Sequence, residues 1–281
     1  MNFLSDILKS TRQAVEVRRQ NRPLREVLAS LESAPPRPDE RVFLEALRKQ
    51  GMAVIAEFKR ASPSEGPLGE NLDIRERVIE YQRGGADALS VLTQESSFHG
   101  SLKDLRDARA TCGLPILEKD FIIDEYQVYE AAEAGADAIL LIVAALEETG
   151  TLLSLYDLAR ELHLDVLVEI RSAQELTEAL DVKADLVGIN NRRLQVPSEL
   201  DIETTYQLVD QVSKNKRITI VSESGIRTRQ ELDALAAVGV DAALIGTALM
   251  KASDPEAKCL ELTGSHRSTN ASRPSDQPAF A

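Results

Sequence analysis

The sequence predicts an α/β domain that closes into a (β/α)8 TIM barrel, with a helical extension before it. Eight short apolar runs alternate with helical patterns along most of the chain. Three junctions between a helix and the next run repeat one design, at 84–91, 134–141 and 238–245. Hydrophobic residues make up 43% of the chain and aromatic residues only 4%. An aliphatic core of this kind is typical of a parallel sheet that is buried on both faces.

The first 50 residues are expected to form helices that pack on the barrel. Apolar residues at helical spacing, beginning with Phe3, Leu4 and Ile7, predict a helix over 2–20. A proline-rich break at 35–38 follows, and a second helix is expected over 39–50.

The barrel itself is expected to occupy residues 51–262. Its strands are short, apolar and bounded by polar residues or glycine, and we expect them at 53–58, 88–93, 115–119, 138–143, 165–170, 186–190, 218–224 and 242–247. Helices are expected between them at 74–83, 102–110, 126–134, 147–162, 173–180, 202–212 and 228–238. Gly84, Gly135 and Gly239 stand at helix ends, where glycine accepts a left-handed backbone.

An open, doubly wound sheet is the alternative to a closed barrel. No G-x-G-x-x-G motif follows the first expected strand, and the eight units are nearly equal in length. Both observations favour closure, which also removes exposed sheet edges. Residues 263–281 have too little apolar content to pack, so we expect a disordered tail.

Charge and cysteine content narrow the classes of function. The net charge of −13 argues against nucleic acid as the main partner. Cys112 and Cys259 are expected to be reduced thiols. With no signal peptide and no apolar run long enough to span a membrane, the sequence predicts a cytoplasmic protein. No His or Cys pair stands at metal-ligand spacing, so we expect no metal.

Polar side chains stand at the ends of most expected strands. They are Glu57, Lys59, Lys119, Glu169, Asn190, Arg192, Ser222, Glu223, Ser224, Gly246 and Thr247. The active site of such a barrel lies at these carboxyl ends, and lysines beside carboxylates suit acid–base work on an anionic substrate. The alternative is an ion-pair network that only closes the barrel mouth. Because several different strands supply polar groups at the same end, we favour a catalytic site.

The turns after the last two strands carry small residues, at 222–226 and 246–248. Their backbone N–H groups, with a helix N-terminus after each turn, predict a phosphate site. Two tight turns that need glycine only for geometry are the alternative.

Motifs in the order of the chain resemble those of indole-3-glycerol-phosphate synthases. They are IAEFKRASPS (55–64), SVLT (90–93) with Phe98 and Gly100-Ser101, LEKDFI (117–122), LVE (167–169), GINNR (188–192), SESGI (222–226) and LIGT (244–247). The resemblance covers about residues 40–255. It implies a carboxy-lyase of tryptophan biosynthesis, with no cofactor, acting on a small phosphorylated substrate. A monomer or weak homo-oligomer is expected.

The resemblance also implies roles for individual residues. Catalytic roles fall to Lys119, Glu169, Lys59, Glu57 and Asn190; substrate contacts to Ser62, Phe98, Phe121, Arg192, Glu223, Ser224 and Leu244; and phosphate contacts to Lys59, Gly225, Gly246 and Thr247. Lys119 would protonate the ketone oxygen during ring closure and Glu169 would be the base in dehydration. Either lysine could protonate the departing hydroxyl.

This chain departs from the family pattern at a few positions. Arg193 stands where an acidic or amide residue is usual, Thr247 often appears as Ser, and Gly66-Pro67 makes an unusual first loop. Two other functions stay open at this point. One is a paralogue that cyclises or decarboxylates a related aryl substrate, and the other is a non-catalytic barrel that serves as a binding partner.

Overall fold

The protein is represented by a computed structural model, which describes residues 3–34, 37, 40–49, 51–69, 71–147, 150–214 and 217–264. Eight parallel strands close into a barrel in the order β1-β10-β9-β8-β7-β6-β5-β4. They are β1 (Ala53–Phe58), β4 (Ala88–Leu92), β5 (Ile116–Lys119), β6 (Ala138–Ile142), β7 (Asp165–Ile170), β8 (Leu186–Asn190), β9 (Thr219–Glu223) and β10 (Ala242–Ile245). Because β1 pairs with both β10 and β4, the predicted TIM barrel is confirmed and the open sheet is excluded.

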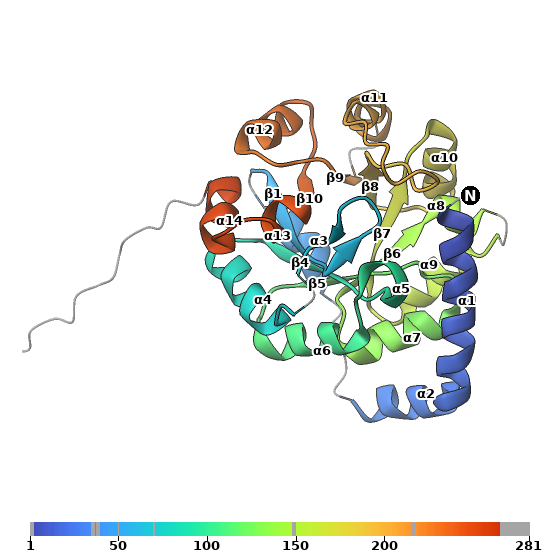
Figure 1. Ribbon diagram of the computed structural model, residues 1–281. Coiled ribbons are helices and arrows are strands. Elements are labelled where there is room, and N and C mark those ends of the chain that lie inside the picture. Colours follow the sequence, from blue (N-terminus) through green and yellow to red (C-terminus); the bar gives the residue numbers. More distant parts are fainter. Residues whose placement is uncertain are drawn as a thin grey trace, which may run out of the picture.

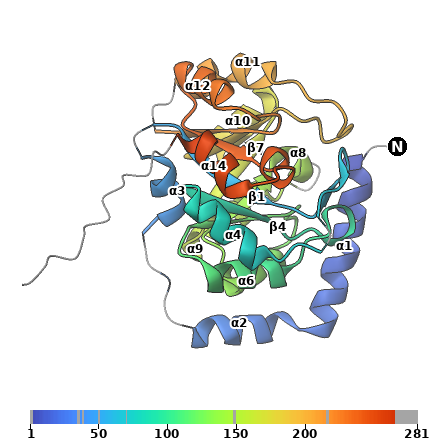
Figure 2. The same cartoon turned by 60° about the vertical axis from the view of Figure 1, so that its left-hand side comes forward.

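Helices surround the barrel on its outer face (Figures 1 and 2). They are α4 (Ile74–Arg83), α6 (Leu102–Thr111), α7 (Glu125–Ala134), α9 (Leu152–Glu161), α10 (Ala173–Asp181), α11 (Glu203–Val212), α12 (Arg229–Ala237) and α14 (Pro255–Thr263). Short helices α5 (Glu95–Phe98), α8 (Val143–Leu146) and α13 (Thr247–Met250) follow three of the strands. The outward strand residues and the helices form one apolar cluster, which includes Val54, Ile116 and Val168.

Alternation along the strands decides what enters the barrel interior. Ile55 of β1, Leu117 of β5 and Leu167 of β7 all belong to the inner apolar cluster. Two residues further along, the same faces carry Glu57, Lys119 and Glu169. The apolar layers therefore fill the barrel, and the charged groups lie in the next layer, at the carboxyl ends of the strands.

The N-terminal extension covers both ends of the barrel. It forms α1 (Phe3–Asn21), α2 (Leu24–Ser33) and α3 (Val42–Leu47). Phe43 and Leu44 of α3 and Leu4 and Ile7 of α1 all join the inner cluster. Figure 2 shows α1 along one side of the molecule, with α2 crossing below the barrel from its lower end, and α2 packs against α7.

The extension and the connecting segments differ from the sequence-based expectation in several places. The helix α2 was not expected, and the helix expected over 39–50 is the shorter α3. The helix expected over 147–162 begins at Leu152, after Gly150 takes a positive φ of 63°. Also unexpected are α5, α8, α13, α14 and a hairpin of β2 (Ala61–Ser62) and β3 (Gly66–Pro67).

The last described helix extends to the expected C-terminal boundary of the barrel. Helix α14 continues through Thr263, and Gly264 ends it in a left-handed conformation. The disordered tail that we expect over 263–281 otherwise lies outside the described residues.

Candidate active site

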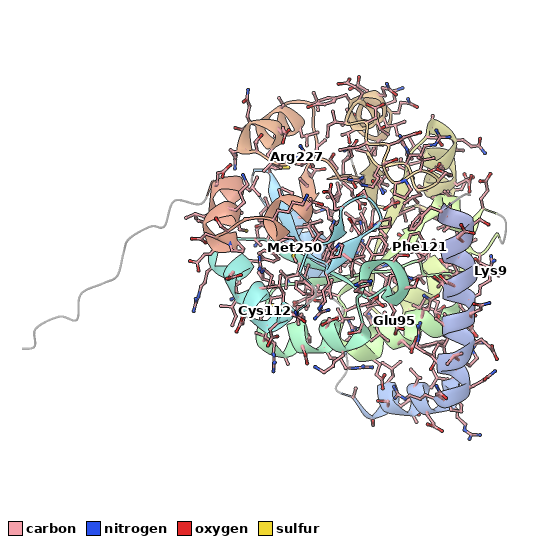
Figure 3. The ribbon with its side chains drawn as sticks, viewed as in Figure 1. Lys9, Glu95, Cys112, Phe121, Arg227 and Met250 are labelled. Atoms are coloured by element: carbon pink, nitrogen blue, oxygen red, sulfur yellow. The ribbon has the colours of Figure 1, made fainter. Side chains whose placement is uncertain are left out.

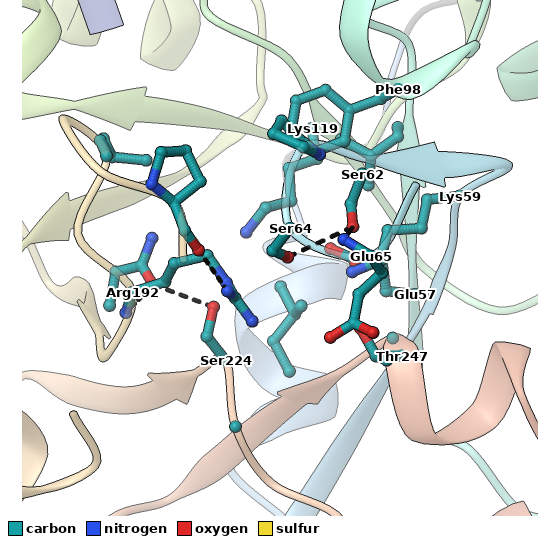
Figure 4. Close-up of a pocket in the computed structure, with 18 of the residues that line it drawn as sticks. Glu57, Lys59, Ser62, Ser64, Glu65, Phe98, Lys119, Arg192, Ser224 and Thr247 are labelled. Atoms are coloured by element: carbon teal, nitrogen blue, oxygen red, sulfur yellow. Dashed lines mark hydrogen bonds and ion pairs between the residues drawn. The ribbon is translucent and has the colours of Figure 1, made fainter. Parts of the chain in front are cut away.

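A pocket opens at the carboxyl ends of the barrel strands, with about 1040 Å³ of space that is partly open to solvent. Of the predicted residues, Ser222 and Glu223 lie outside its walls, which contain Glu57, Lys59, Ser62, Phe98, Lys119, Phe121, Glu169, Asn190, Arg192, Ser224, Gly225, Leu244, Gly246 and Thr247. Figure 4 shows the labelled side chains approaching one space from different walls. The closed barrel therefore brings together groups that are separated by up to 190 positions in the chain, from Glu57 to Thr247.

Lys119 lies among three carboxylates that come from other strands. Its Nζ forms an ion pair with Glu223 and lies 3.9 Å from Glu169 Oε2. Glu223 is completely buried beneath the pocket, so its predicted contact with substrate is not seen in the pocket wall. Its described contact is the ion pair with the lysine that lies above it.

These contacts set the protonation states of the cluster. Burial opposes the charge of Lys119, but Glu223, Glu57 and Glu169 outweigh it and raise the pKa of this ammonium group. Burial, followed by the charge of Glu223, raises the pKa of Glu169 to about 8. The site thus pairs a lysine that holds its proton with a glutamate that titrates near neutrality.

A second pair, Glu57 with Lys59, lies on the β1 side of the pocket. Lys59 Nζ donates to Glu57 Oε1 over 2.5 Å. Burial acts to raise the pKa of Glu57, but the charges of Lys59 and Lys119 lower it below its ordinary value. Glu57 therefore remains a carboxylate although only 3% of its surface is exposed.

Two glycines make room for these buried pairs. A Cβ at Gly246 would lie 2.1 Å from Glu57 Oε1 and 2.9 Å from Lys59 Nζ. A Cβ at Gly188 would lie 2.2 Å from Glu223 Oε1. Both positions need glycine because of space, since neither residue has a positive φ.

Hydrogen bonds hold the ends of β8 and β9 together. Asn190 Oδ1 accepts from Ser224 Oγ over 3.0 Å and from Arg192 N over 2.9 Å. Beneath it, the buried amide of Asn191 donates to Ser222 Oγ and Ser224 O and accepts from Thr205. This network supports Ser224 at a positive φ of 70°, an uncommon conformation for a residue with a Cβ.

The predicted phosphate end lies where β9 and β10 finish. Gly225 has a φ of 90° and lines the pocket beside Gly246 and Thr247, which begins α13. The N-terminus of α12 is already occupied, because Arg227 N and Thr228 N both donate to Glu231 Oε2. The helix N-terminus that we expected to help after β9 is thus used by a capping box.

The opposite side of the pocket is apolar. Phe98 and Phe121 face it, as expected, together with Leu140 and Ile142 of β6 and Leu244 of β10. The fourth barrel strand, β6, ends in apolar residues and forms part of this wall. The pocket therefore has one apolar side and one side suited to an anion.

Several residues of the pocket wall, Arg227 among them, were not sequence-based candidates. Phe3 comes from α1, Asp120 follows Lys119, and Glu65 lies at the tip of the β2–β3 hairpin, where its Oε2 accepts from Lys251 Nζ over 2.5 Å. The apolar face of α1 was a usable signal for Phe3. No local sequence pattern indicates that Glu65 pairs with Lys251, which lies 186 positions away.

Other features expected from the sequence can be located within the described residues. Both cysteines are free and buried. Arg193, a departure from the family pattern, forms an exposed ion pair with Glu199 at 3.1 Å. In the described ranges, no set of three His, Cys, Asp or Glu side chains is arranged as a metal site. The described helices are too short or too polar to cross a bilayer.

Comparison with known proteins points to one family. A family model described as indole-3-glycerol phosphate synthase matches residues 4–262. A protein of that name from Polynucleobacter asymbioticus is 46% identical over 226 residues, which cover 79% of this chain and 83% of the relative. Its counterpart from Lachnospira eligens is 45% identical over 217 residues, covering 76% and 80%. The one from Thermoanaerobacter pseudethanolicus is 40% identical over 251 residues, covering 89% and 93%.

Solved structures agree on the fold. A 3-hexulose-6-phosphate synthase matches with a TM-score of 0.59 and 19% identity, covering 76% of this chain and 99% of that one. Thiamine phosphate pyrophosphorylase from Pyrococcus furiosus matches with a TM-score of 0.52 and 19% identity, covering 78% and 96%. At this identity the likeness concerns the barrel architecture alone.

Proposed function

Because this chain belongs to the indole-3-glycerol phosphate synthase family, we propose that the lysines and carboxylates at its barrel mouth divide the steps of the family's reaction. These enzymes are carboxy-lyases of tryptophan biosynthesis. They convert 1-(2-carboxyphenylamino)-1-deoxyribulose 5-phosphate into indole-3-glycerol phosphate, carbon dioxide and water. The observation that carries the assignment of roles is the position of Lys119 between Glu169 and Glu223.

The two sides of the pocket orient the substrate. Its phosphate lies against Gly225, Gly246 and Thr247, with Lys59 nearby, and its aromatic ring lies between Phe98 and Phe121. Ser62 and Arg192 contact the carboxylate and hydroxyl groups between these ends. An apolar wall on one side also excludes water from the ring that reacts.

Lys119 acts as the general acid of ring closure. The arene carbon that carries the carboxylate attacks the ketone carbon, and the ketone oxygen takes a proton from the ammonium group as the new bond forms. Glu223, Glu57 and Glu169 raise the pKa of Lys119 and keep it protonated before this step. Carbon dioxide then leaves, and the electrons of the broken C–C bond restore the aromatic ring.

Glu169 acts as the base of dehydration. It removes a proton from the methylene carbon beside the nitrogen, while the hydroxyl leaves as water with a proton from a lysine. A carboxylate whose pKa is about 8 is a much stronger base than an exposed one. Asn190, bonded to Ser224 and Arg192, fixes the groups that surround the departing hydroxyl.

Replacing Lys119 tests these roles. Lys119→Met removes the acid and should reduce kcat by about 10²–10⁴-fold, the usual contribution of a positioned acid. Indole fluorescence follows turnover, and circular dichroism checks the fold. Lys103→Met is the matched control, because Lys103 is exposed and pairs with Asp107 on its own helix. Normal turnover in the Lys119 variant would disprove the assignment.

Single-turnover measurements separate the two candidate acids of dehydration. If Lys59 protonates the departing hydroxyl, Lys59→Met should release carbon dioxide at a near-normal rate and accumulate the undehydrated intermediate. If Lys119 serves both steps, carbon dioxide release and dehydration should slow only in the Lys119 variant.

We also propose the setting in which the protein works. We expect a cytoplasmic enzyme, its net charge of −13 argues against nucleic acid as a partner, and a monomer or weak homo-oligomer remains our expectation. Light scattering over a range of protein concentrations measures the oligomeric state.

A further inference from the structure

Four cationic side chains line the pocket, and three of them are already engaged by groups of the protein. Lys59 pairs with Glu57, and Lys119 pairs with Glu223. Arg192 donates to Pro197 O over 2.5 Å. A substrate with a phosphate and a carboxylate brings additional negative charge into the pocket. The three cations above already balance groups of the protein, so this charge needs a further positive partner.

Arg227 is the fourth cation, and its surroundings are different. It is exposed at the pocket edge, two residues after Gly225, and its guanidinium has no hydrogen bond or ion pair to the described residues. Figure 3 marks it beside the loop that leads into α12. Its long side chain can therefore turn toward a bound anion without breaking an existing contact.

The backbone of the same loop has fewer groups to offer. The N–H groups of Arg227 and Thr228 are held by Glu231 at 2.6 and 2.9 Å. The carboxylate of Glu231 thus offsets part of the positive charge at this end of α12. The Arg227 side chain supplies positive charge on the same side of the phosphate end.

The field of Arg227 reaches across the pocket mouth. The hydrogen bond from Lys251 is the main cause of the lowered pKa of Glu65, and the charges of Arg192 and Arg227 act in the same direction. Burial lowers the pKa of Arg192, and repulsion from Arg227 adds to this effect. Arg192 and Arg227 therefore both contribute positive charge at the mouth beside Gly225, although the chain as a whole carries a charge of −13.

We propose that Arg227 is a further phosphate-binding residue, whose guanidinium pairs with the substrate phosphate held at Gly225, Gly246 and Thr247. This inference rests on the proposed placement of the phosphate at that end of the pocket. Arginine suits the role because its planar group can donate two parallel hydrogen bonds to phosphate oxygens. The residue touches no reacting atom, so it binds ground state and transition state alike.

Steady-state kinetics of Arg227→Gln tests the proposal. Loss of a charge-assisted bond should raise KM by about 10-fold and leave kcat within about 2-fold, as expected for uniform binding. Arg227→Lys keeps the charge but loses the paired geometry, so it should give an intermediate KM. Arg193→Gln is the matched control, since it removes one exposed positive charge that is paired with Glu199 and does not line this pocket.

Calorimetric titration with inorganic phosphate measures the affinity of the phosphate end directly, without turnover. The Kd for phosphate should rise by a similar factor in Arg227→Gln and stay unchanged in Arg193→Gln. An unchanged KM and Kd in Arg227→Gln, or an equal rise in both variants, would overturn the proposal while leaving the catalytic roles intact. If the unaltered protein binds phosphate but does not turn over, the catalytic roles fail and the Arg227 result still stands.

Discussion

Glu169 combines burial with the nearby charge of Glu223, and together these raise its pKa to about 8 against the opposing charge of Lys119. Only 3% of its surface is exposed, and Glu223 adds a second negative charge nearby. A group of this kind can accept and return a proton within one catalytic cycle.

The pH dependence of turnover should report this group. The base form is required, so kcat/KM for the unaltered enzyme should fall as the pH drops below about 8. Glu169→Gln should reduce kcat by about 10²-fold or more and lose this dependence. Activity measured from neutral to alkaline pH checks both, with Glu175→Gln on α10 as the control. A pH limb that persists in Glu169→Gln would assign the ionisation to another group.

The sequence predicted which residues gather at the carboxyl ends of the strands, but it did not predict how deeply each of them lies. Charged residues directly after apolar strands are conspicuous, and parallel strands bring them to one rim, so Lys119 and Glu169 could be placed together. Glu223 follows the same pattern, yet it lies below the pocket because Gly188 on the neighbouring strand leaves space for its carboxylate. Which of two rim carboxylates is buried depends on that neighbour, which no local pattern reveals.

At the scale of elements, β5 separates two environments. Its inner face carries Lys119, and its outer face carries Glu118, which is buried between the barrel and the helices. Glu118 Oε1 accepts from Thr93 Oγ1 over 2.9 Å, whereas Oε2 has no hydrogen-bond partner among the described residues. Burial, and then the charge of Asp120, raises the pKa of Glu118 to about 8.

This outer carboxyl group should make stability depend on pH. The folded protein binds the proton of Glu118 more tightly than the unfolded chain does. The contribution of this proton to the free energy of unfolding is therefore fully present below pH 4.5 and is lost as the pH rises to about 8. Glu118→Gln cannot ionise, so it should exceed the unaltered protein in stability at alkaline pH by about 1–3 kcal/mol. Urea unfolding at acidic and alkaline pH measures the difference. Equal stabilities at alkaline pH would show that Glu118 ionises without cost.

Strands were easier to predict than helices for a physical reason. A fully buried strand such as β7 or β8 is a continuous apolar run with sharp ends, and both matched their predicted bounds. Helix α2 was not predicted although Leu24, Val27 and Leu31 have helical spacing. The proline-rich segment that follows it led us to treat the residues after the first helix as a break. The β2–β3 hairpin has two residues per strand, too few for any periodicity.

At the scale of the whole molecule, Arg41 joins the extension to the closed end of the barrel. Its Nε donates to Asp165 Oδ1 of β7 over 2.6 Å, and its Nη2 donates to Asp185 Oδ1 before β8 over 2.9 Å. Burial acts to raise the pKa of Asp185, but the hydrogen bond and the charge of Arg41 lower it below 3.8. One side chain thus ties α3 to two strands.

Removing this side chain should destabilise the protein. We expect Arg41→Gln to lower the free energy of unfolding by about 2–4 kcal/mol at neutral pH, since it leaves two partly buried carboxylates with fewer partners. The part that depends on Asp185 is present above its ordinary pKa of 3.8 and disappears as the pH falls further. Arg193→Gln is the control, because its ion pair with Glu199 is exposed. If both variants unfold at the same urea concentration, Arg41 does not hold the barrel closed.

The pairing of β1 with β10 has a consequence for how the protein can be assayed. Glu57 and Lys59 leave β1 beside Gly246, which follows β10, so the first and last strands meet at the catalytic rim. Lys119 likewise meets its carboxylates only when strands from both halves of the chain have docked. A folding intermediate in which the last strand has not yet docked should be compact but catalytically inactive. Recovery of turnover by a cut or circularly permuted chain would therefore report that this seam has formed again.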